Sequence, residues 1–504
     1  MTRKFLCVIV VIYNRIEIKM PKRPKTSLGL KKLATTKLKL IFGGAIFLTL
    51  ALIAVIGASQ IQMIREFFSE ASGNPANLII DTQAVLGQLP RPWRYLAQGG
   101  EDHAWRLAPL STQVKALNPQ YVRLDHIYDF YDIVGGTPGN LTFDFAKFDL
   151  VLKDINGVGA KPYISLSYMP PAIADGDIIS KPKRWSDWQL VTQKTIEHVS
   201  GALGIEDVYY EVWNEPDLFG GWKYGGAKNY LDLYTYAAYG ADAAAKTRGV
   251  RDFKFGGPAI TALYKNWFDA LAKHVIANNL RYDFFSWHRY TTDLNQYAKD
   301  MSEVKAWILA YPQLEPRLEF HITEWGHDSN NNSGYDNRFS AAHTVAGAIS
   351  MVGIVDKAFG FEIQDGKDPA GQAYWGRWGL FTHADAGAKA KPRYYGLRLL
   401  DRLSDQRLQL TGEGSWIKAL AAKNTTTNTT EVVIANYDPK GGHNENVPLT
   451  FENIVPGSYI VKKEFLSGLR NQQKVATTSS VLQVQIPITS NDVVWVELIQ
   501  NLEL

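Results

Sequence analysis

The sequence predicts an α/β fold: a (β/α)₈ TIM barrel, with a C-terminal β-sandwich after it and an N-terminal transmembrane helix before it. Short β-rich runs alternate with amphipathic helical stretches from residue 78 to residue 404, as parallel βαβ units do. Two of those runs end in a glutamate flanked by aromatic residues, as at the C-terminal rim of a barrel. From 405 to 504, short strands follow one another with turns between them.

The N-terminal segment, residues 1–39, carries most of the positive charge of the chain. It holds 11 Lys or Arg and one acidic residue, whereas the remaining residues hold 43 basic and 49 acidic ones. The folded part is therefore mildly acidic, and it lacks the basic surface that nucleic-acid binding requires. The only cysteine, Cys7, lies in this segment, so an intramolecular disulfide is excluded.

Residues 40–58 are 19 uncharged, mostly apolar residues that directly follow the basic segment. About 20 apolar residues span a bilayer, and the basic flank stays in the cytoplasm. We therefore expect a cytoplasmic leader at 1–39, a transmembrane anchor at 40–58 and a tether at 59–77. A cleaved signal peptide with a small-residue site at Gly57-Ala58-Ser59 is the alternative. In both cases the rest of the chain lies outside the cytoplasm, periplasmic or extracellular, and it is secreted if the leader is cleaved.

Residues 78–404 supply about 40 residues for each of eight βα units, which suits a barrel with extended loops. The expected strands lie at 121–124, 162–166, 208–213, 253–256, 284–288, 318–323 and 358–363. The expected helices lie at 188–203, 230–247, 267–278 and 341–354.

Residues 405–504 are predicted to form the accessory β-sandwich. Alternating strands are expected at 431–437, 458–465, 481–486 and 493–498, separated by Gly, Pro, Asn and Asp. Structural support for the barrel and sugar binding are both compatible with this part of the sequence.

Two glutamates carry the expected chemistry. Glu215 closes the run Val212-Trp213-Asn214-Glu215, and Glu324 closes the run Phe320 to Thr323. They lie 109 positions apart, which corresponds to about three βα units, so they should share one rim of the barrel. A pair of carboxylates in one pocket is what cleavage of a glycosidic bond needs, one as proton donor and one as nucleophile or base.

Four polar side chains are expected beside these glutamates. Asn214 can donate a hydrogen bond to a substrate hydroxyl. His288 and Tyr290 share one side of a strand and can bind the nucleophile or a sugar hydroxyl, although a structural histidine is the alternative. Arg123 at an early strand tip can hold the nucleophile in its anionic form, or pair structurally within the barrel.

Aromatic residues in the predicted rim loops are candidates for sugar binding because a flat apolar face suits a pyranose ring. The candidates are Trp325 and Trp375, with Trp378 and Trp222 as further ones. No Cys/His cluster with metal-ligand spacing, no phosphate loop and no Gly-x-Ser-x-Gly motif occurs. We therefore expect neither a metal nor another cofactor.

Asn214-Glu215 and Glu324 resemble the two catalytic motifs of the clan A glycoside hydrolases, and the chain is most similar to family 39. That family comprises β-xylosidases, α-iduronidases and some exopolysaccharide endoglycosidases. The resemblance covers about 85–400 and implies that Glu215 is the acid/base and Glu324 the nucleophile. Further stretches support it: Leu89–Trp93, Lys161–Pro170, Gly256–Ala259, Ser286–Tyr290 and Lys391–Tyr395.

The chain departs from the family pattern at two places near the expected sugar pocket. The early strand of the family usually continues Arg-x-His-Gly, whereas this chain has Asp125-His126 after Arg123-Leu124. An aromatic residue near the eighth strand is commonly Trp, whereas this chain has Phe361. Both departures bear on substrate identity.

The sequence therefore predicts a membrane-anchored retaining glycoside hydrolase that acts by double displacement on an oligosaccharide or polysaccharide. Exo action on β-xylosides and endo action on an extracellular polysaccharide both fit. The alternative is a non-catalytic carbohydrate-binding barrel in polysaccharide export or biosynthesis. The oligomeric state is left open.

Overall fold

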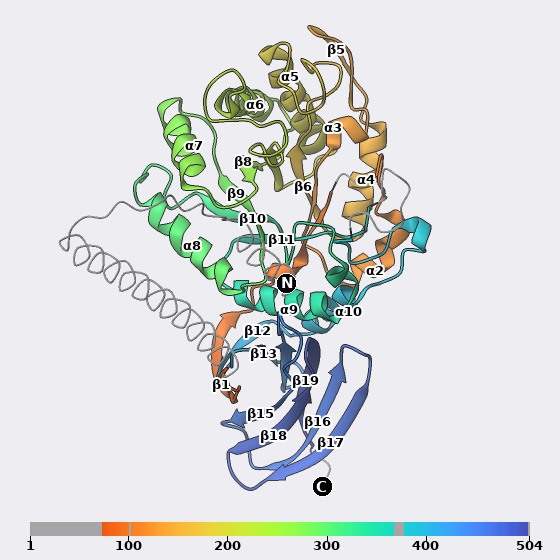
Figure 1. The fold of residues 1–504 in the computed structure, drawn as a ribbon, viewed down its shortest axis with the longest axis vertical. Coiled ribbons are helices and arrows are strands. Elements are labelled where there is room, and N and C mark those ends of the chain that lie inside the picture. Colours follow the sequence, from red (N-terminus) through yellow and green to blue (C-terminus); the bar gives the residue numbers. More distant parts are fainter. Residues whose placement is uncertain (1–72, 100–101, 367–376, 502–504) are drawn as a thin grey trace, which may run out of the picture. The chain divides into compact units, whose positions relative to one another are not determined.

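The computed structural model describes residues 73–99, 102–366 and 377–501. The predicted leader, the anchor at 40–58 and residues 59–72 of the tether lie outside these residues. Within the described ranges, no helix combines the length and the apolar composition that crossing a bilayer requires. Residues from Asn74 onward belong to one compact unit, which contains a barrel and a C-terminal sheet (Figure 1).

Eight parallel strands close into a barrel, in the order β10-β11-β2-β3-β6-β7-β8-β9. This confirms the predicted eight-strand barrel. The strands are β2 (Tyr95–Gln98), β3 (Tyr121–Leu124), β6 (Lys161–Leu166), β7 (Val208–Val212), β8 (Phe253–Ile260), β9 (Phe284–Tyr290), β10 (Glu319–Gly326) and β11 (Lys357–Phe361). All but β2 fall on the predicted runs.

Helices follow the strands and cover the outside of the barrel (Figure 1). They are α2 (Ser111–Lys115), α3 (Ile127–Phe130), α4 (Ala146–Gly157), α5 (Trp185–Ile196), α6 (Tyr230–Ala245), α7 (Lys265–Ala277), α8 (Asn295–Ile308), α9 (Arg338–Met351) and α10 (Pro392–Leu400). A small hairpin of β4 (Val134–Thr137) and β5 (Asn140–Phe143) stands between β3 and α4. Because both faces of the barrel strands are covered, strands such as β7 are buried along their whole length.

The inside of the barrel is filled in layers. At its lower end, Tyr163 and Tyr209 stack with ring centroids 5.3 Å apart, and Phe284 and Phe359 complete this aromatic layer. Such a layer makes the barrel a packed core, not a pore. The charged side chains discussed below lie nearer the C-terminal ends of the strands, where the barrel opens to solvent.

The C-terminal part is one nine-stranded sheet in the order β17-β16-β19-β14-β13-β12-β1-β15-β18. The predicted C-terminal sheet is thus present, but its hydrogen bonding is continuous, not divided into two separate sheets. Its first strand is β1 (Leu78–Gln88), and the others are β12 (Gln406–Thr411), β13 (Ile417–Asn424), β14 (Thr429–Asn436), β15 (Glu445–Glu452), β16 (Gly457–Phe465), β17 (Arg470–Thr477), β18 (Val481–Ile488) and β19 (Asp492–Gln500).

The sheet curves around a single apolar core. Val461 and Val496 from one half pack in the same cluster as Val447 and Ile486 from the other half. The Lys463 ammonium on β16 donates a hydrogen bond of 3.1 Å to the carbonyl of Gln485 on β18, which links strands near opposite ends of the sheet order. The result encloses a core as a sandwich does.

The barrel begins later than the expected residue 78. Strand β1 pairs antiparallel with β12 and parallel with β15, so it belongs to the C-terminal sheet. Its buried residues alternate, with Leu78, Ile80 and Thr82 inside, which is typical of a sheet with one solvated face. The first barrel strand is β2, which no predicted strand covers.

The sheet packs against the barrel through α9 and α10. The Arg402 guanidinium lies 3.4 Å above the centre of the Trp495 ring and pairs with Glu464 at 2.6 Å. The Tyr437 hydroxyl donates to the Thr292 carbonyl at 3.0 Å.

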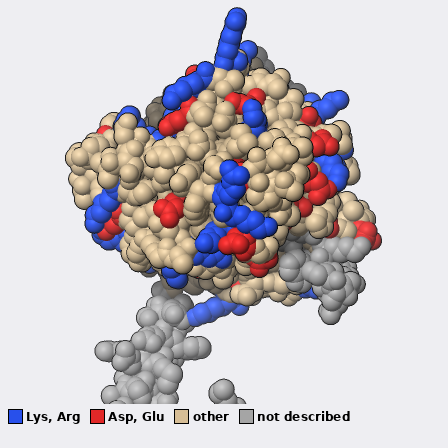
Figure 2. Space-filling view, turned by 90° about the horizontal axis from the view of Figure 1, so that it is seen from above, with Lys and Arg blue, Asp and Glu red and all other residues tan. Residues whose placement is uncertain are grey.

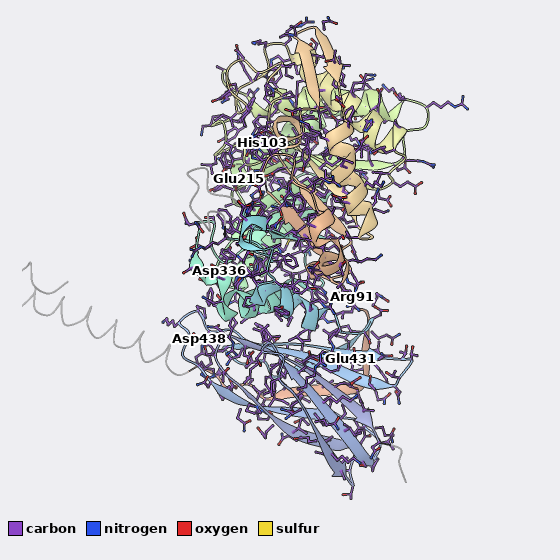
Figure 3. All side chains as sticks on the ribbon, turned by 90° about the vertical axis from the view of Figure 1, so that its right-hand side faces the viewer. Arg91, His103, Glu215, Asp336, Glu431 and Asp438 are labelled. Atoms are coloured by element: carbon purple, nitrogen blue, oxygen red, sulfur yellow. The ribbon has the colours of Figure 1, made fainter. Side chains whose placement is uncertain are left out.

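Figure 3 shows Glu215 in the barrel and Glu431 in the sheet. Basic and acidic residues are intermingled on the face shown in Figure 2.

Candidate active site

A cavity of about 860 Å³ opens at the C-terminal end of the barrel strands. Glu215, just after β7, and Glu324, within β10, both line it, as predicted from their positions at strand ends. Its other lining residues are Gly99, Asp125, His126, Tyr168, Asn214, Leu218, Phe219, Thr261, Ala262, Arg289, Tyr290, Ser329, Asn330, Phe361 and Trp378.

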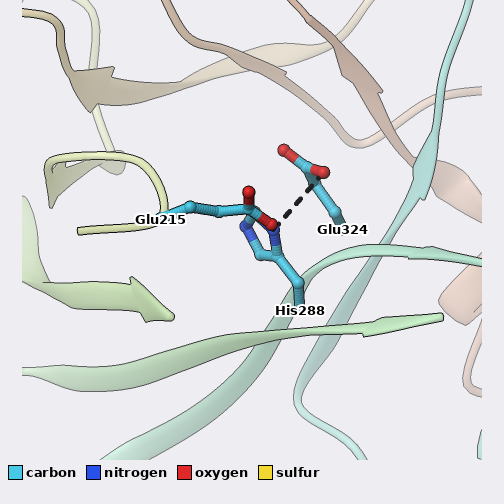
Figure 4. A group of neighbouring side chains, drawn as sticks. All are labelled: Glu215, His288 and Glu324. Atoms are coloured by element: carbon cyan, nitrogen blue, oxygen red, sulfur yellow. Dashed lines mark hydrogen bonds and ion pairs between the residues drawn. The ribbon is translucent and has the colours of Figure 1, made fainter. Parts of the chain in front are cut away.

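The two glutamates meet at His288 (Figure 4). A carboxylate oxygen of Glu215, a ring nitrogen of His288 and a carboxylate oxygen of Glu324 all lie within 4.8 Å of one another. His288 Nδ1 is 2.8 Å from Glu215 Oε1 and 3.4 Å from Glu324 Oε2. His288 comes from β9, between β8 and β10, so its fully buried ring bridges the two carboxylates.

Glu324 is held on both of its oxygens. Arg123 Nη1 donates to Oε1 at 3.0 Å, and the Tyr290 hydroxyl donates to Oε2 at 2.8 Å. Arg123 itself is fully buried and also donates to Glu211 at 2.8 Å and to Asn214 at 2.7 Å. Charge-assisted hydrogen bonds of this kind fix the direction of a carboxylate and favour its ionised form.

Burial and neighbouring charges shift the pKa values of this group. Burial raises the pKa of Glu324 to about 7, against the lowering effect of His288 and Arg123. Burial disfavours the charged form of His288, but Glu324 and Glu215 outweigh it, so the pKa of His288 is raised above its usual value. The protonation of Glu324 therefore depends on that of the neighbouring His288 imidazole, 3.4 Å away.

The backbone around Glu215 is strained. Trp213 and Glu215 have φ values of 74° and 45°, in a region that non-glycine residues rarely adopt. The Ser165 hydroxyl donates to the Trp213 carbonyl at 2.8 Å, and the Glu215 amide donates to the Ala259 carbonyl at 2.9 Å. These bonds hold the strained turn that carries Glu215 toward the cavity, and strain of this kind is concentrated at functional sites.

The structure brings six of the predicted residues together: Arg123, Asn214, Glu215, His288, Tyr290 and Glu324. Asn214 accepts from Arg123 and donates to the Tyr168 hydroxyl at 3.1 Å. Its amide is therefore engaged with protein groups at the rim as well as lining the cavity.

Of the tryptophans predicted to contact sugar, the structure places one in the cavity. Trp325 was expected to contact sugar, but it is 1% exposed and packs on Tyr297 and His343. Successive side chains on a strand point to opposite faces, so Glu324 facing the cavity places Trp325 toward the helices. Trp222 is also buried, and Trp375 lies outside the described residues. Trp378 does line the cavity, with Phe361 edge-on at 5.8 Å.

Several lining residues were not predicted as site residues. Tyr168 lies two positions after β6, and Phe219 lies in the loop after Glu215. Asp125 and His126 directly follow β3. Their common signal is a position just past a strand end, where loops of a barrel carry function.

Glu215, His288 and Glu324 are also the group among the described residues that could hold a metal ion. Their donor atoms already bind one another, Arg123 and Tyr290, so a metal ion would have to replace these hydrogen bonds. The expectation that the site works without a metal stays a prediction.

Comparison with known proteins identifies the family of this chain. The model of Glycosyl hydrolases family 39 matches residues 80–464. A β-xylosidase of Caldicellulosiruptor saccharolyticus is 27% identical over 366 residues, which cover 67% of this chain and 70% of that enzyme. A β-xylosidase of Geobacillus stearothermophilus is 25% identical over 305 residues, covering 54% of this chain and 58% of that enzyme.

Comparison with solved structures shows a similar fold. The crystal structure of a monomeric β-xylosidase from Caulobacter crescentus superposes with a TM-score of 0.70 at 20% identity, covering 85% of this chain and 100% of that one. At this identity the likeness concerns the fold alone. The family match, however, spans more than half of the chain, so the chain belongs to the glycosyl hydrolases of family 39 and is a glycosidase.

Proposed function

We propose that this glycosidase hydrolyses O-glycosidic bonds with retention of configuration, through a covalent glycosyl-enzyme. An oxygen of Glu324 bonds to the anomeric carbon while the bond to the leaving oxygen breaks, and Glu215 gives that oxygen its proton. Glu215 then takes a proton from water, the water oxygen bonds to the anomeric carbon, and the bond to Glu324 breaks. Each step balances with the two glutamates and one water.

The spacing of the carboxylates carries this proposal. Retaining enzymes hold their two carboxyl groups about 5–5.5 Å apart, whereas inverting enzymes need about 6.5–9.5 Å to admit a water. One carboxylate oxygen of Glu215 and one of Glu324 lie within 4.8 Å of each other, which supports the shorter of these two spacings. Both carboxylates also share one cavity in a family of hydrolases, which disfavours a non-catalytic binding barrel.

The hydrogen bonds of Glu324 support its assignment as the nucleophile. Arg123 and Tyr290 occupy both of its oxygens as donors, so a proton on Glu324 would displace one of them. Among the described residues, the Glu215 carboxylate contacts a single donor or acceptor, the His288 ring, which leaves its other oxygen for the leaving group. Its side chain is also more exposed than that of Glu324, 14% against 8%.

The proposed substrates are β-xylosides, because two similar proteins are named β-xylosidases, or an extracellular polysaccharide with related linkages. Hydrolysis of aryl β-xylosides by the purified protein tests the first possibility. Product sizing on bacterial exopolysaccharides tests the second. Activity on the aryl substrate that Glu324→Ala abolishes and azide partly restores supports the proposed roles. Full activity of Glu324→Ala would contradict them.

We also propose that the catalytic unit acts outside the cytoplasm, attached to the membrane through residues 40–58. The uncharged run at these positions and the basic segment before it support this orientation. Reporter fusions after residue 77, one active only outside the cytoplasm and one only inside, test it. Activity of the cytoplasmic reporter alone would contradict the proposal, and release of the fusion into the medium would favour a cleaved leader.

A further inference from the structure

One acidic side chain in the cavity, Asp125, has no hydrogen-bond partner for its Oδ1 among the residues that the structure describes. Asp125 directly follows β3, lines the cavity and is 7% exposed. Its Oδ1 is buried and accepts no hydrogen bond from any residue that the structure describes. Neither does its carboxylate form an ion pair within the described ranges. Buried polar groups nearly always have a partner, and each exception calls for an explanation.

The cations around Asp125 are engaged elsewhere. His126 Nδ1 lies 2.8 Å from Asp129, and Arg289 pairs with both oxygens of Asp300 at 2.6 and 2.9 Å. The donors of Arg123 go to Glu211, Glu324 and Asn214. Burial without a partner raises the pKa of Asp125 above its usual value. Among the described residues, no donor therefore satisfies Oδ1 of Asp125, which lines the same cavity as Glu324.

We propose that Asp125 determines substrate specificity by accepting a hydrogen bond from a ring hydroxyl of the sugar bound between Glu215 and Glu324. This inference rests on the proposed function, because the proposed function places the sugar between Glu215 and Glu324. An ionised carboxylate is an acceptor without donors, so it matches a hydroxyl and not a carboxylate. A uronic acid would bring a further negative charge into a cavity that already holds Asp125 and Glu324, and like charges at close range repel strongly. Asp125 thus selects neutral sugars over uronic acids.

The burial of Asp125 also explains why a sugar hydroxyl is a suitable partner for its carboxylate. Burial of the Asp125 carboxylate costs desolvation free energy, and a hydrogen bond from a substrate hydroxyl offsets part of that cost. Sites built to bind a hydroxyl reject analogues that lack it, because the buried group is then left unpaired. Asp125 should therefore contribute to discrimination more than to stability of the fold.

The test compares the Asp125→Ala and Asp125→Asn variants with the original protein, each as the full chain. The substrates are para-nitrophenyl β-xyloside, its monodeoxy analogues and para-nitrophenyl β-glucuronide. We expect kcat/KM on the xyloside to fall by about 10- to 100-fold in Asp125→Ala, the range of one charge-assisted hydrogen bond. One monodeoxy analogue should be poor for the original protein and no poorer for Asp125→Ala. The preference for xyloside over glucuronide should fall at least tenfold in Asp125→Asn.

Asp252→Asn is the matched control, because Asp252 is exposed and precedes β8 at the opposite end of the barrel. Equal losses on every deoxy analogue, or an unchanged xyloside-to-glucuronide ratio, would overturn the role of Asp125 while leaving the glycosidase mechanism intact. If the original protein hydrolyses none of these substrates, calorimetric binding of xylo-oligosaccharides decides. Binding weakened about tenfold in Asp125→Ala supports the inference, whereas equal binding, or none by either protein, overturns it.

Discussion

The hydroxyl of Tyr290 lies 2.8 Å from Oε2 of Glu324 and donates a hydrogen bond to it. Tyr290 is the last residue of β9, and Glu324 lies in the neighbouring β10, so the bond joins adjacent strands at the rim. It leaves Glu324 oriented by two donors, Tyr290 on one oxygen and Arg123 on the other. The geometry of the proposed nucleophile therefore depends on residues from three strands.

Replacing Tyr290 with Phe removes one of these donors and keeps the ring. We expect kcat on an aryl glycoside to fall by about 10- to 100-fold, as for a hydrogen bond to a charged group. Loss of a donor to the ionised form also raises the pKa of Glu324, so the acid limb of the pH profile should move upward. Tyr234→Phe is the control, since Tyr234 donates to the Arg281 carbonyl away from the cavity. An unchanged acid limb would contradict the direct role of Tyr290.

Arg123 offers a test that separates stability from activity. Arg123→Met leaves Glu211 buried without its cation, and breaking a buried pair costs about 3–5 kcal/mol. Urea unfolding should show a loss of that order. Adding Glu211→Gln removes the buried charge and should restore most of the stability. Activity should stay low in both variants, because Glu324 has lost Arg123. Recovery of activity with stability would mean that Arg123 acts only on the fold.

The pH dependence of kcat/KM follows from the state of Glu324. Its pKa is raised to about 7 by burial, and attack requires the ionised form. Activity should therefore fall as pH drops through 7, well above the ordinary range of a glutamate. Steady-state kinetics across pH 4 to 9 measure this limb as an apparent value of the coupled group. An acid limb at or below the ordinary glutamate pKa of 4.5 would contradict the role of burial.

The free energy of unfolding should also depend on the protonation of Glu324, and it should decrease as pH rises. Between pH 4.5 and about 7 the folded protein keeps a proton on Glu324 that the unfolded chain has lost. Stability from this group therefore falls as pH rises through that window. Glu324→Gln lacks this dependence, and its advantage over the original protein should grow by up to ~3 kcal/mol across the window. Parallel stability-versus-pH curves for the two proteins would contradict the raised pKa.

Much of the site was predictable because its residues follow strand ends in sequence. Glu215 and Glu324 end apolar runs, and His288 and Tyr290 lie on the same side of one strand. These patterns are visible in the sequence alone, so the four residues could be predicted without the structure. The same alternation excludes Trp325 once Glu324 faces the cavity. Asp125 stood out only as a departure from the family pattern. That no described residue donates to its Oδ1 depends on the pairing of His126 with Asp129 and of Arg289 with Asp300, which the sequence does not show.

The fold was predictable where the pattern is local and not where pairing is remote. The seven predicted barrel strands fall on observed strands, whereas no predicted strand covers β2. The place of β1 depends on its pairing with strands more than 300 residues away, such as Ile79 with Thr411. Glu211 lies inside an apolar strand, and its role as partner of Arg123 appears only when β3 and β7 close into one barrel.

Labelling of the nucleophile tests the central claim most directly. A 2-deoxy-2-fluoro glycoside with a good leaving group slows hydrolysis of the glycosyl-enzyme, so the intermediate can be digested and mapped by mass spectrometry. The account predicts that the fluorosugar is attached to the peptide that contains Glu324, through the carboxylate held by Arg123 and Tyr290. Attachment to Glu215, or turnover without any covalent adduct, would contradict it.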